Sequence, residues 1–144
     1  MKSILILNGP NLNLLGTREP DIYGDSTLED IEALCRKRAG EMGIGIEFIQ
    51  SNHEGELVDA IQSAGEKHHG VALNAAAYTH TSIALLDAVK ALDIPVVEVH
   101  LSNVFRRESF RKRSFISPVA VGVICGFGIH SYVLAMDALV STAA

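Results

Sequence analysis

The feature that most constrains the fold is a regular alternation of short apolar runs with helical patterns along the whole chain. The apolar runs predict strands at 2–8, 44–50, 71–74, 96–100 and 120–125. The helical patterns fall at 27–42, 55–67, 82–92 and 129–140. Strands that are apolar throughout and alternate with helices are typical of a parallel sheet covered on both faces. We therefore expect an α/β fold, a flavodoxin-like doubly wound sheet of five parallel strands in the order 2-1-3-4-5.

The helix expected at 27–42 has the clearest boundaries. Ser26 and Glu29 have the spacing of a capping box, and Gly43 follows as a natural stop. In the next helix, Leu57, Ile61 and Ala64 recur at helical spacing and should face the sheet.

Length and composition indicate one soluble domain. The chain has 144 residues, of which 48% are hydrophobic, so we expect a single catalytic domain over 1–144. The net charge of −5 argues against a nucleic-acid partner, because nucleic-acid binders usually carry a basic excess. It does not exclude a small anionic ligand, which a few local arginines can attract.

The remaining compositional signals predict a cytoplasmic protein with no membrane partner. The four consecutive apolar residues near the N-terminus are too few for a signal peptide, and the apolar stretch at 119–129 is too short to cross a bilayer. Cys35 and Cys125 have no paired spacing, so we expect both to be buried, reduced thiols.

A long loop follows the first strand, with the sequence NGPNLNLLGTREPDIYG at 8–24. Loops of this length are uncommon in compact domains and are often functional. Its leucines and Ile22 could anchor parts of it, and Arg18 precedes Tyr23 by five residues. A nearby cation lowers the pKa of a phenol from about 10, which makes the phenol more useful as a base. We therefore expect residues 9–24 to form an active-site lid.

Polar and titratable side chains gather where three of the predicted strands end. They are Asn8, Asn11, Asn13, Arg18 and Tyr23 after the first, Asn74, Tyr78, Thr79 and His80 after the third, and Glu98, His100, Ser102, Arg107 and Arg111 at and beyond the fourth. Ligands of doubly wound sheets bind beyond the carboxyl ends of the strands. Glu98 and His100 lie two residues apart on one face of a strand, where a carboxylate can orient an imidazole as a general acid.

Each of these residues also has an ordinary structural interpretation. His100 could cap a strand, Tyr23 could be a packing residue, and the arginines around Arg111 could form a solvated basic face. The sequence has no phosphate-binding loop, dinucleotide fingerprint, nucleophile elbow or spaced metal-ligand set, and none of its lysines ends an apolar strand. We therefore expect acid–base chemistry on a polar or anionic small molecule, with no cofactor and no metal.

The sequence closely resembles the type II 3-dehydroquinate dehydratases over nearly its whole length. The matching blocks are NGPNLNLLGTREPDIYG, SNHEGELVD, NAAAYTHTS, EVHLSN and FRKRSFISPVAVGVICGFG. The first block is highly specific, whereas YTHTS would be weak by itself. The chain departs from the family's usual pattern at Phe105-Arg106, where members often carry His-Ala, and the segment 129–131 also looks variable.

The resemblance implies a cofactor-free lyase that dehydrates 3-dehydroquinate to 3-dehydroshikimate through an enolate. Tyr23 then matches the family's tyrosinate base, and Arg18 the residue that lowers the pKa of that base. Asn11 would hold an ordered water against the enolate oxygen. His100, oriented by Glu98, matches the family's acid.

The resemblance also implies binding roles and an assembly. The matching positions for substrate binding are Asn74, His80, Asp87, Leu101, Ser102 and Arg111. Asn74 and His80 would hold ring hydroxyls, the backbone of Leu101 and Ser102 the carboxylate, and Arg111 a hydroxyl at the mouth. Asp87 would reach the site of a neighbouring subunit, since the family forms trimers that assemble into homododecamers.

Two other functions compete with this enzyme. A non-catalytic flavodoxin-like binding domain would need an acceptor Asp cluster or a flavin loop, and the sequence has neither. An inactive homologue kept for assembly is disfavoured by the intact set of Arg18, Tyr23, Glu98 and His100. The sequence does not distinguish aromatic biosynthesis from quinate breakdown as the setting of the reaction.

Overall fold

A computed structural model describes residues 3–17 and 19–143, with the backbone but not the side chain described at Tyr23 and Ala143. The strands are β1 (Ser3–Asn8), β2 (Gly45–Gln50), β3 (Val71–Asn74), β4 (Val96–His100) and β5 (Gly122–Cys125). The helices are α1 (Pro20–Tyr23), α2 (Leu28–Met42), α3 (Glu54–Lys67), α4 (Ile83–Lys90) and α5 (His130–Ala143). Short 3₁₀ turns cover Leu12–Leu14, Ala76–His80, Val104–Arg106 and Ser109–Arg111.

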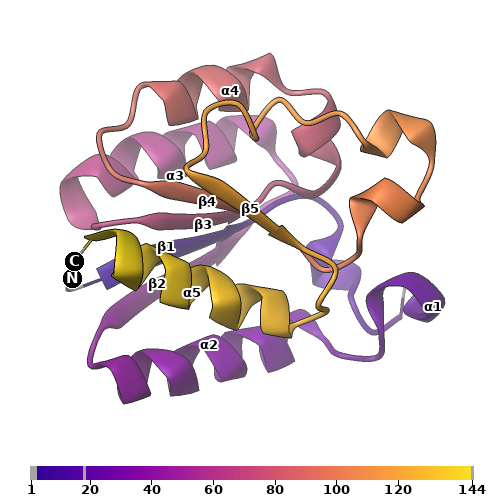
Figure 1. Cartoon of the computed structure of the whole chain (residues 1–144), viewed down its shortest axis with the longest axis horizontal. Coiled ribbons are helices and arrows are strands. Elements are labelled where there is room, and N and C mark those ends of the chain that lie inside the picture. The colour runs from indigo at the N-terminus through magenta and orange to yellow at the C-terminus, as the bar shows by residue number, and fades with distance from the viewer. Residues whose placement is uncertain (1–2, 18, 144) are drawn as a thin grey trace.

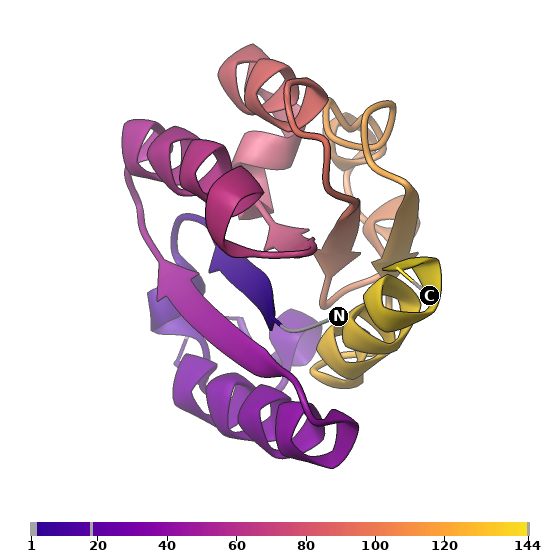
Figure 2. The same cartoon turned by 90° about the vertical axis from the view of Figure 1, so that its left-hand side faces the viewer.

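The strands form one parallel sheet in the order β2-β1-β3-β4-β5 (Figure 1), which confirms the predicted doubly wound fold. The alternation of side chains along each strand divides the core into two layers. Ile4 and Ile6 face a layer under α2 and α5, whereas Leu5 and Leu7 face the layer under α3 and α4. Figure 2, seen from the side, shows these helix pairs on opposite faces of the sheet.

The structure confirms the apolar face predicted for α3 and the predicted end of α2. Leu57, Ile61 and Ala64 of α3 are buried as expected, and α2 ends at Gly43 in the left-handed conformation (φ 69°). Cys35 is buried as predicted, and burial raises the pKa of its thiol to about 12. Cys125 is only partly buried, so the expectation of burial holds for one of the two thiols.

Two local predictions were wrong. The capping box of α2 lies one residue later than expected, because Thr27 accepts from the Asp30 N–H and Asp30 accepts from the Thr27 N–H. In the long loop, Leu12 and Leu15 are buried and anchor it, but Leu14 and Ile22 are exposed. The sequence pattern also did not predict α1 within this loop.

The ends of β1 and β3 approach each other closely at the point where the winding of the sheet reverses. The Gly9 N–H donates to the Asn74 carbonyl oxygen at 2.8 Å. A Cβ at position 9 would lie 2.4 Å from the Ala75 carbonyl oxygen, so the approach requires glycine. Within the described residues, no helix is long and apolar enough to cross a membrane.

Candidate active site

A pocket opens at the carboxyl ends of β1, β3 and β4, at the position expected for a doubly wound sheet. It encloses about 580 Å³ of space, part of which is open to solvent. Three segments line it: the loop after β1, the 3₁₀ turn after β3, and the connection that follows β4. The lining residues that carry polar side chains are Asn11, Asn74, His80, His100, Ser102, Arg107 and Arg111.

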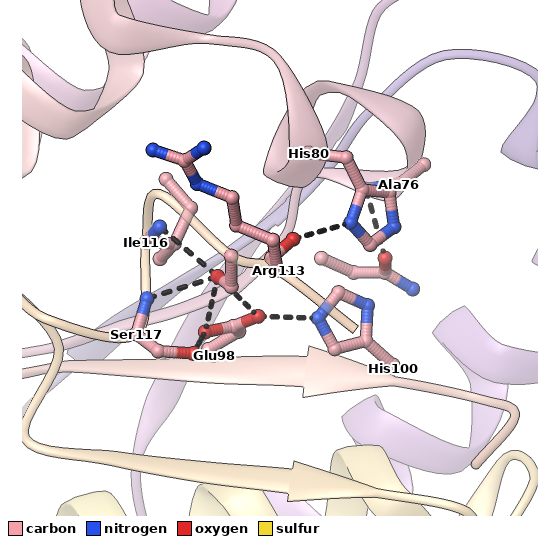
Figure 3. A network of polar contacts seen from close by, with 9 residues as sticks. Ala76, His80, Glu98, His100, Arg113, Ile116 and Ser117 are labelled. Carbon is pink, nitrogen blue, oxygen red and sulfur yellow. Dashed lines mark hydrogen bonds and ion pairs between the residues drawn. The ribbon is translucent and has the colours of Figure 1, made fainter. Parts of the chain in front are cut away.

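His100 and Glu98 form a hydrogen-bonded pair at the end of β4. The His100 Nε2 lies 2.5 Å from the Glu98 Oε2, and both side chains are buried. Their spacing of two residues places both on one face of the strand, as the sequence predicts. Because Glu98 occupies Nε2, Nδ1 is the His100 ring nitrogen left to meet a ligand. Figure 3 shows this pair beside His80.

Two serines complete the surroundings of the Glu98 carboxylate. Ser117 Oγ donates to Oε1 at 2.5 Å (Figure 3). Ser114 Oγ shares its proton between the two carboxylate oxygens, at 3.1 and 3.0 Å. Ser114 Oγ in turn accepts from the N–H groups of Ile116 and Ser117 at 3.0 Å. The turn at 114–117 therefore presents two hydroxyl donors to a buried acid.

These contacts keep Glu98 ionised. Burial by itself raises the pKa of the Glu98 carboxyl, but the hydrogen bond and charge of His100, with the hydroxyls of Ser117 and Ser114, outweigh burial and lower it below its usual value. A carboxylate that stays charged can accept hydrogen bonds but cannot donate them. It therefore holds the His100 ring in the one orientation that points an N–H at it.

His80 lies beside His100 in the wall of the pocket. The two rings are stacked, with centroids 6.5 Å apart and planes 15° from parallel. His80 Nδ1 lies 2.7 Å from the Arg113 carbonyl oxygen, which can only accept, so Nδ1 carries a proton and donates. Nε2 is then the His80 nitrogen available to a ligand.

The segment after β2 supports the start of the long loop. The Asn52 side-chain oxygen accepts from the Asn11 N–H at 3.0 Å and from Gln50 Nε2 at 3.1 Å. Gln50 Nε2 also donates to the Gly9 carbonyl oxygen at 3.1 Å. Tyr78 holds this segment from the other side through its hydroxyl, which donates to the Asn52 carbonyl oxygen at 2.8 Å. Asn11, held by these contacts, adopts a left-handed backbone (φ 67°).

The wall beyond β4 is cationic. Arg107 and Arg111 both line the pocket, and Arg111 forms an ion pair with Glu108. This wall favours an anionic ligand despite the net negative charge of the chain.

The structure brings most of the predicted site residues together. Asn11, Asn74, His80, His100, Leu101, Ser102 and Arg111 line the pocket, and Glu98 lies behind His100. Asp87 is exposed on α4 and does not line the pocket. Arg18 lies outside the described residues, and for Tyr23 the structure describes only the backbone, at the end of α1.

Sequence reasoning missed the residues that act behind the pocket wall. Ser114 and Ser117 on Glu98, Asn52 behind Asn11, and Tyr132 behind Asn74 are brought there by tertiary folding. The motif SNHEGELVD contained Asn52, but nothing in its local pattern indicated a contact with Asn11. Among the described residues, no three His, Cys, Asp or Glu side chains are grouped so that they could hold a metal ion.

Comparison with known proteins gives consistent matches over nearly the whole chain. Residues 2–140 match the model of the family Dehydroquinase class II. The chain is 62% identical over 138 residues to the 3-dehydroquinate dehydratase of Rhizobium johnstonii, covering 96% of this chain and 95% of that protein. It is 63% identical over 140 residues to the 3-dehydroquinate dehydratase of Azorhizobium caulinodans, covering 97% of this chain and 95% of that protein. Among solved structures, the type II dehydroquinase from Butyrivibrio crossotus aligns with a TM-score of 0.94 at 43% identity, covering 96% of this chain and 97% of that chain.

Proposed function

The chain belongs to the class II dehydroquinase family, and from this premise we propose that it removes water from 3-dehydroquinate to give 3-dehydroshikimate. The observation that carries the proposal is the buried Glu98–His100 pair at a cationic pocket, in a chain that matches the family over 2–140. The pocket offers a proton donor, a positively charged wall and hydroxyl-binding groups, which this substrate and reaction need.

The first step is removal of a proton next to the ring ketone. Tyr23, as tyrosinate, takes this proton, and Arg18 stabilises the phenolate by its positive charge. The electron pair of the broken C–H bond moves onto the ketone oxygen and forms an enolate. Asn11 holds an ordered water that donates a hydrogen bond to that oxygen.

The second step is loss of the hydroxyl group. The enolate oxygen re-forms the ketone, the electron pair of the enolate C=C shifts to make the new ring double bond, and the C–O bond breaks. His100 Nδ1 delivers a proton to the departing oxygen, so that water leaves. Glu98 accepts from Nε2 at 2.5 Å and keeps Nδ1 directed at the pocket. Each positioned proton transfer contributes about 10²- to 10⁴-fold in rate.

We assign substrate binding to the remaining groups that line the pocket. The ring hydroxyls bind Asn74 and His80, the carboxylate binds the backbone at Leu101 and Ser102, and Arg111 contacts a hydroxyl at the mouth. The segment 9–24 acts as the lid over this pocket, with its inner part anchored by the buried Leu12 and Leu15.

Assembly as trimers that form a homododecamer, with Asp87 reaching a neighbouring site, stays a prediction, as does a cytoplasmic location. The exposed apolar side chains of Val121, Val123 and Phe127 along and beyond β5 offer surface for such contacts. Mass photometry of the purified protein would measure the subunit number, and a monomer would contradict this assembly.

A direct assay tests the reaction. The purified protein should convert 3-dehydroquinate to an enone that absorbs in the ultraviolet, both with a chelator present and after borohydride treatment in the presence of substrate. The variant Tyr23→Phe should fold normally and lose turnover by at least about 10²-fold, because it removes the base. Absence of turnover by the unmodified chain would reject the proposed function, and full turnover by Tyr23→Phe would reject the role of Tyr23.

A further inference from the structure

A chain of buried hydrogen bonds runs beneath the pocket from β1 through α5 to β3. The Tyr132 hydroxyl donates to Asn8 Oδ1 at 2.6 Å and accepts from Asn74 Nδ2 at 2.8 Å. Asn8 and Tyr132 are fully buried, and Asn74 is 3% exposed. Of these three side chains, Asn74 lines the pocket, so Tyr132 touches the site through it.

The direction of every bond in this chain follows from two backbone groups at its ends. Asn8 Nδ2 lies 3.1 Å from the Ile49 carbonyl oxygen, which can only accept, so Asn8 Oδ1 must face Tyr132. At the other end, the Ala76 N–H lies 3.1 Å from Asn74 Oδ1 and can only donate. The Tyr132 hydroxyl links the two by donating to Asn8 and accepting from Asn74, and a flip of either amide would break two bonds.

Burial keeps the link intact. It raises the pKa of the Tyr132 hydroxyl above its ordinary value, so the phenol keeps the proton that it donates to Asn8. A phenylalanine at this position would leave an amide oxygen and an amide N–H buried without partners, and buried polar groups without partners are costly.

We propose that Tyr132 is a positioning residue that sets the orientation of the Asn74 amide toward the substrate. With one N–H committed to Tyr132 and one lone pair of Oδ1 to Ala76, Asn74 has one donor and one acceptor left for a ligand. This pair suits two neighbouring hydroxyls of a ring, of which one accepts and the other donates. The inference rests on the proposed function, in which Asn74 binds ring hydroxyls.

The test replaces Tyr132 by phenylalanine and separates binding from turnover. In Tyr132→Phe the Asn74 amide can rotate, so KM for 3-dehydroquinate should rise by about 10- to 100-fold, while kcat stays within about threefold. With an analogue that lacks one of the two neighbouring ring hydroxyls, wild type and variant should differ much less in KM, because the oriented amide then has one fewer partner. An unchanged KM in the folded variant, or a rise that is as large for the analogue, overturns the proposal.

The matched control is Met136→Ala, which removes a fully buried apolar side chain one turn further along α5 in the same core layer as Tyr132. It should lower thermal stability but leave KM within about twofold, since it alters packing without altering the hydrogen-bond chain. A KM rise in Met136→Ala equal to that of Tyr132→Phe would show a packing effect and overturn the proposal.

Two further measurements cover the remaining outcomes. If Tyr132→Phe does not fold, 3,5-difluorotyrosine can be placed at position 132. It keeps the shape of the ring but weakens the hydroxyl as an acceptor, so KM should rise severalfold, and an unchanged KM overturns the proposal.

If the unmodified chain does not turn over 3-dehydroquinate, the proposed function fails separately. Crystal structures of wild type and variant then decide the role of Tyr132, because Asn74 should rotate away from Ala76 in the variant, and an unmoved Asn74 overturns it.

Discussion

At the scale of single residues, the buried Glu98 carboxylate is the group on which the geometry of the site depends. Its oxygens accept hydrogen bonds from His100, Ser114 and Ser117. The spacing of Glu98 and His100 in the sequence predicted their contact, since residues two apart in a strand share a face. The two serines could not be predicted, because they come from a turn that meets β4 only after folding.

Replacement of Glu98 by glutamine should lower the rate of catalysis and change how the free energy of unfolding depends on pH in the acid range. Glu98→Gln should lower kcat by about 10²- to 10⁴-fold, since the imidazole loses the carboxylate that orients it. The pKa of Glu98 is lower in the folded chain than its ordinary 4.5, so the stability that the carboxylate contributes is present above about pH 4.5 and is lost as pH falls through the folded-state pKa.

Urea unfolding between pH 7 and pH 3 measures this second effect. Wild type should lose more stability over that range than Glu98→Gln, which has no carboxyl to protonate at position 98. Glu66→Gln, at an exposed position on α3, serves as the control and should keep the pH dependence of wild type. Parallel pH profiles for wild type and Glu98→Gln would contradict the assignment.

At the scale of elements, the start of α2 shows that a local sequence pattern can leave two candidate helix caps. Both Ser26 with Glu29 and Thr27 with Asp30 have the spacing of a cap, and the structure uses the second pair. A Cβ at Gly16 would lie 3.0 Å from the Thr27 methyl group, so the long loop packs closely on the residue that caps α2. Both pairs satisfy the local pattern, so local propensity alone does not select the cap.

The two candidate caps can be separated by alanine substitution. Thr27→Ala removes the hydroxyl that accepts from the Asp30 N–H and should lower the free energy of unfolding by about 1 kcal/mol. Ser26→Ala should change it by less than about 0.5 kcal/mol, as expected for a substitution away from a specific interaction. Denaturant melts of the two variants make the comparison, and an equal loss in both would contradict the observed cap.

At the scale of the whole molecule, the site depends on how closely β1 and β3 approach at the reversal of the sheet. Gly9 contacts the backbone of Asn74 and Ala75, and the buried chain through Asn8 and Tyr132 ties both strand ends to α5. The strands, the loop and a helix from the far end of the chain are therefore coupled around one pocket.

Gly9→Ala tests this close approach of the strand ends, and Gly40→Ala serves as its control. Gly9→Ala places a methyl group 2.4 Å from the Ala75 carbonyl oxygen, so it should cost about 2 kcal/mol or more and weaken substrate binding. Gly40→Ala lies in α2 with open space around the new methyl group and should stabilise the chain by about 0.5–1 kcal/mol. Thermal melts with KM measurements check both, and a neutral Gly9→Ala would show that the strand ends can separate without cost.

The sequence by itself determined the sheet order, the positions of the main elements and the edge at which Asn74, His80 and His100 meet. These follow from hydrophobic period and connectivity, which are local properties of the chain. Only the tertiary structure decided which side chains stand behind the pocket wall: Ser114 and Ser117 on Glu98, Asn52 on Asn11, and Tyr132 on Asn74. Those partners lie 16 to 58 residues apart in the chain, and no local pattern encodes a hydrogen bond that forms only when distant segments pack together.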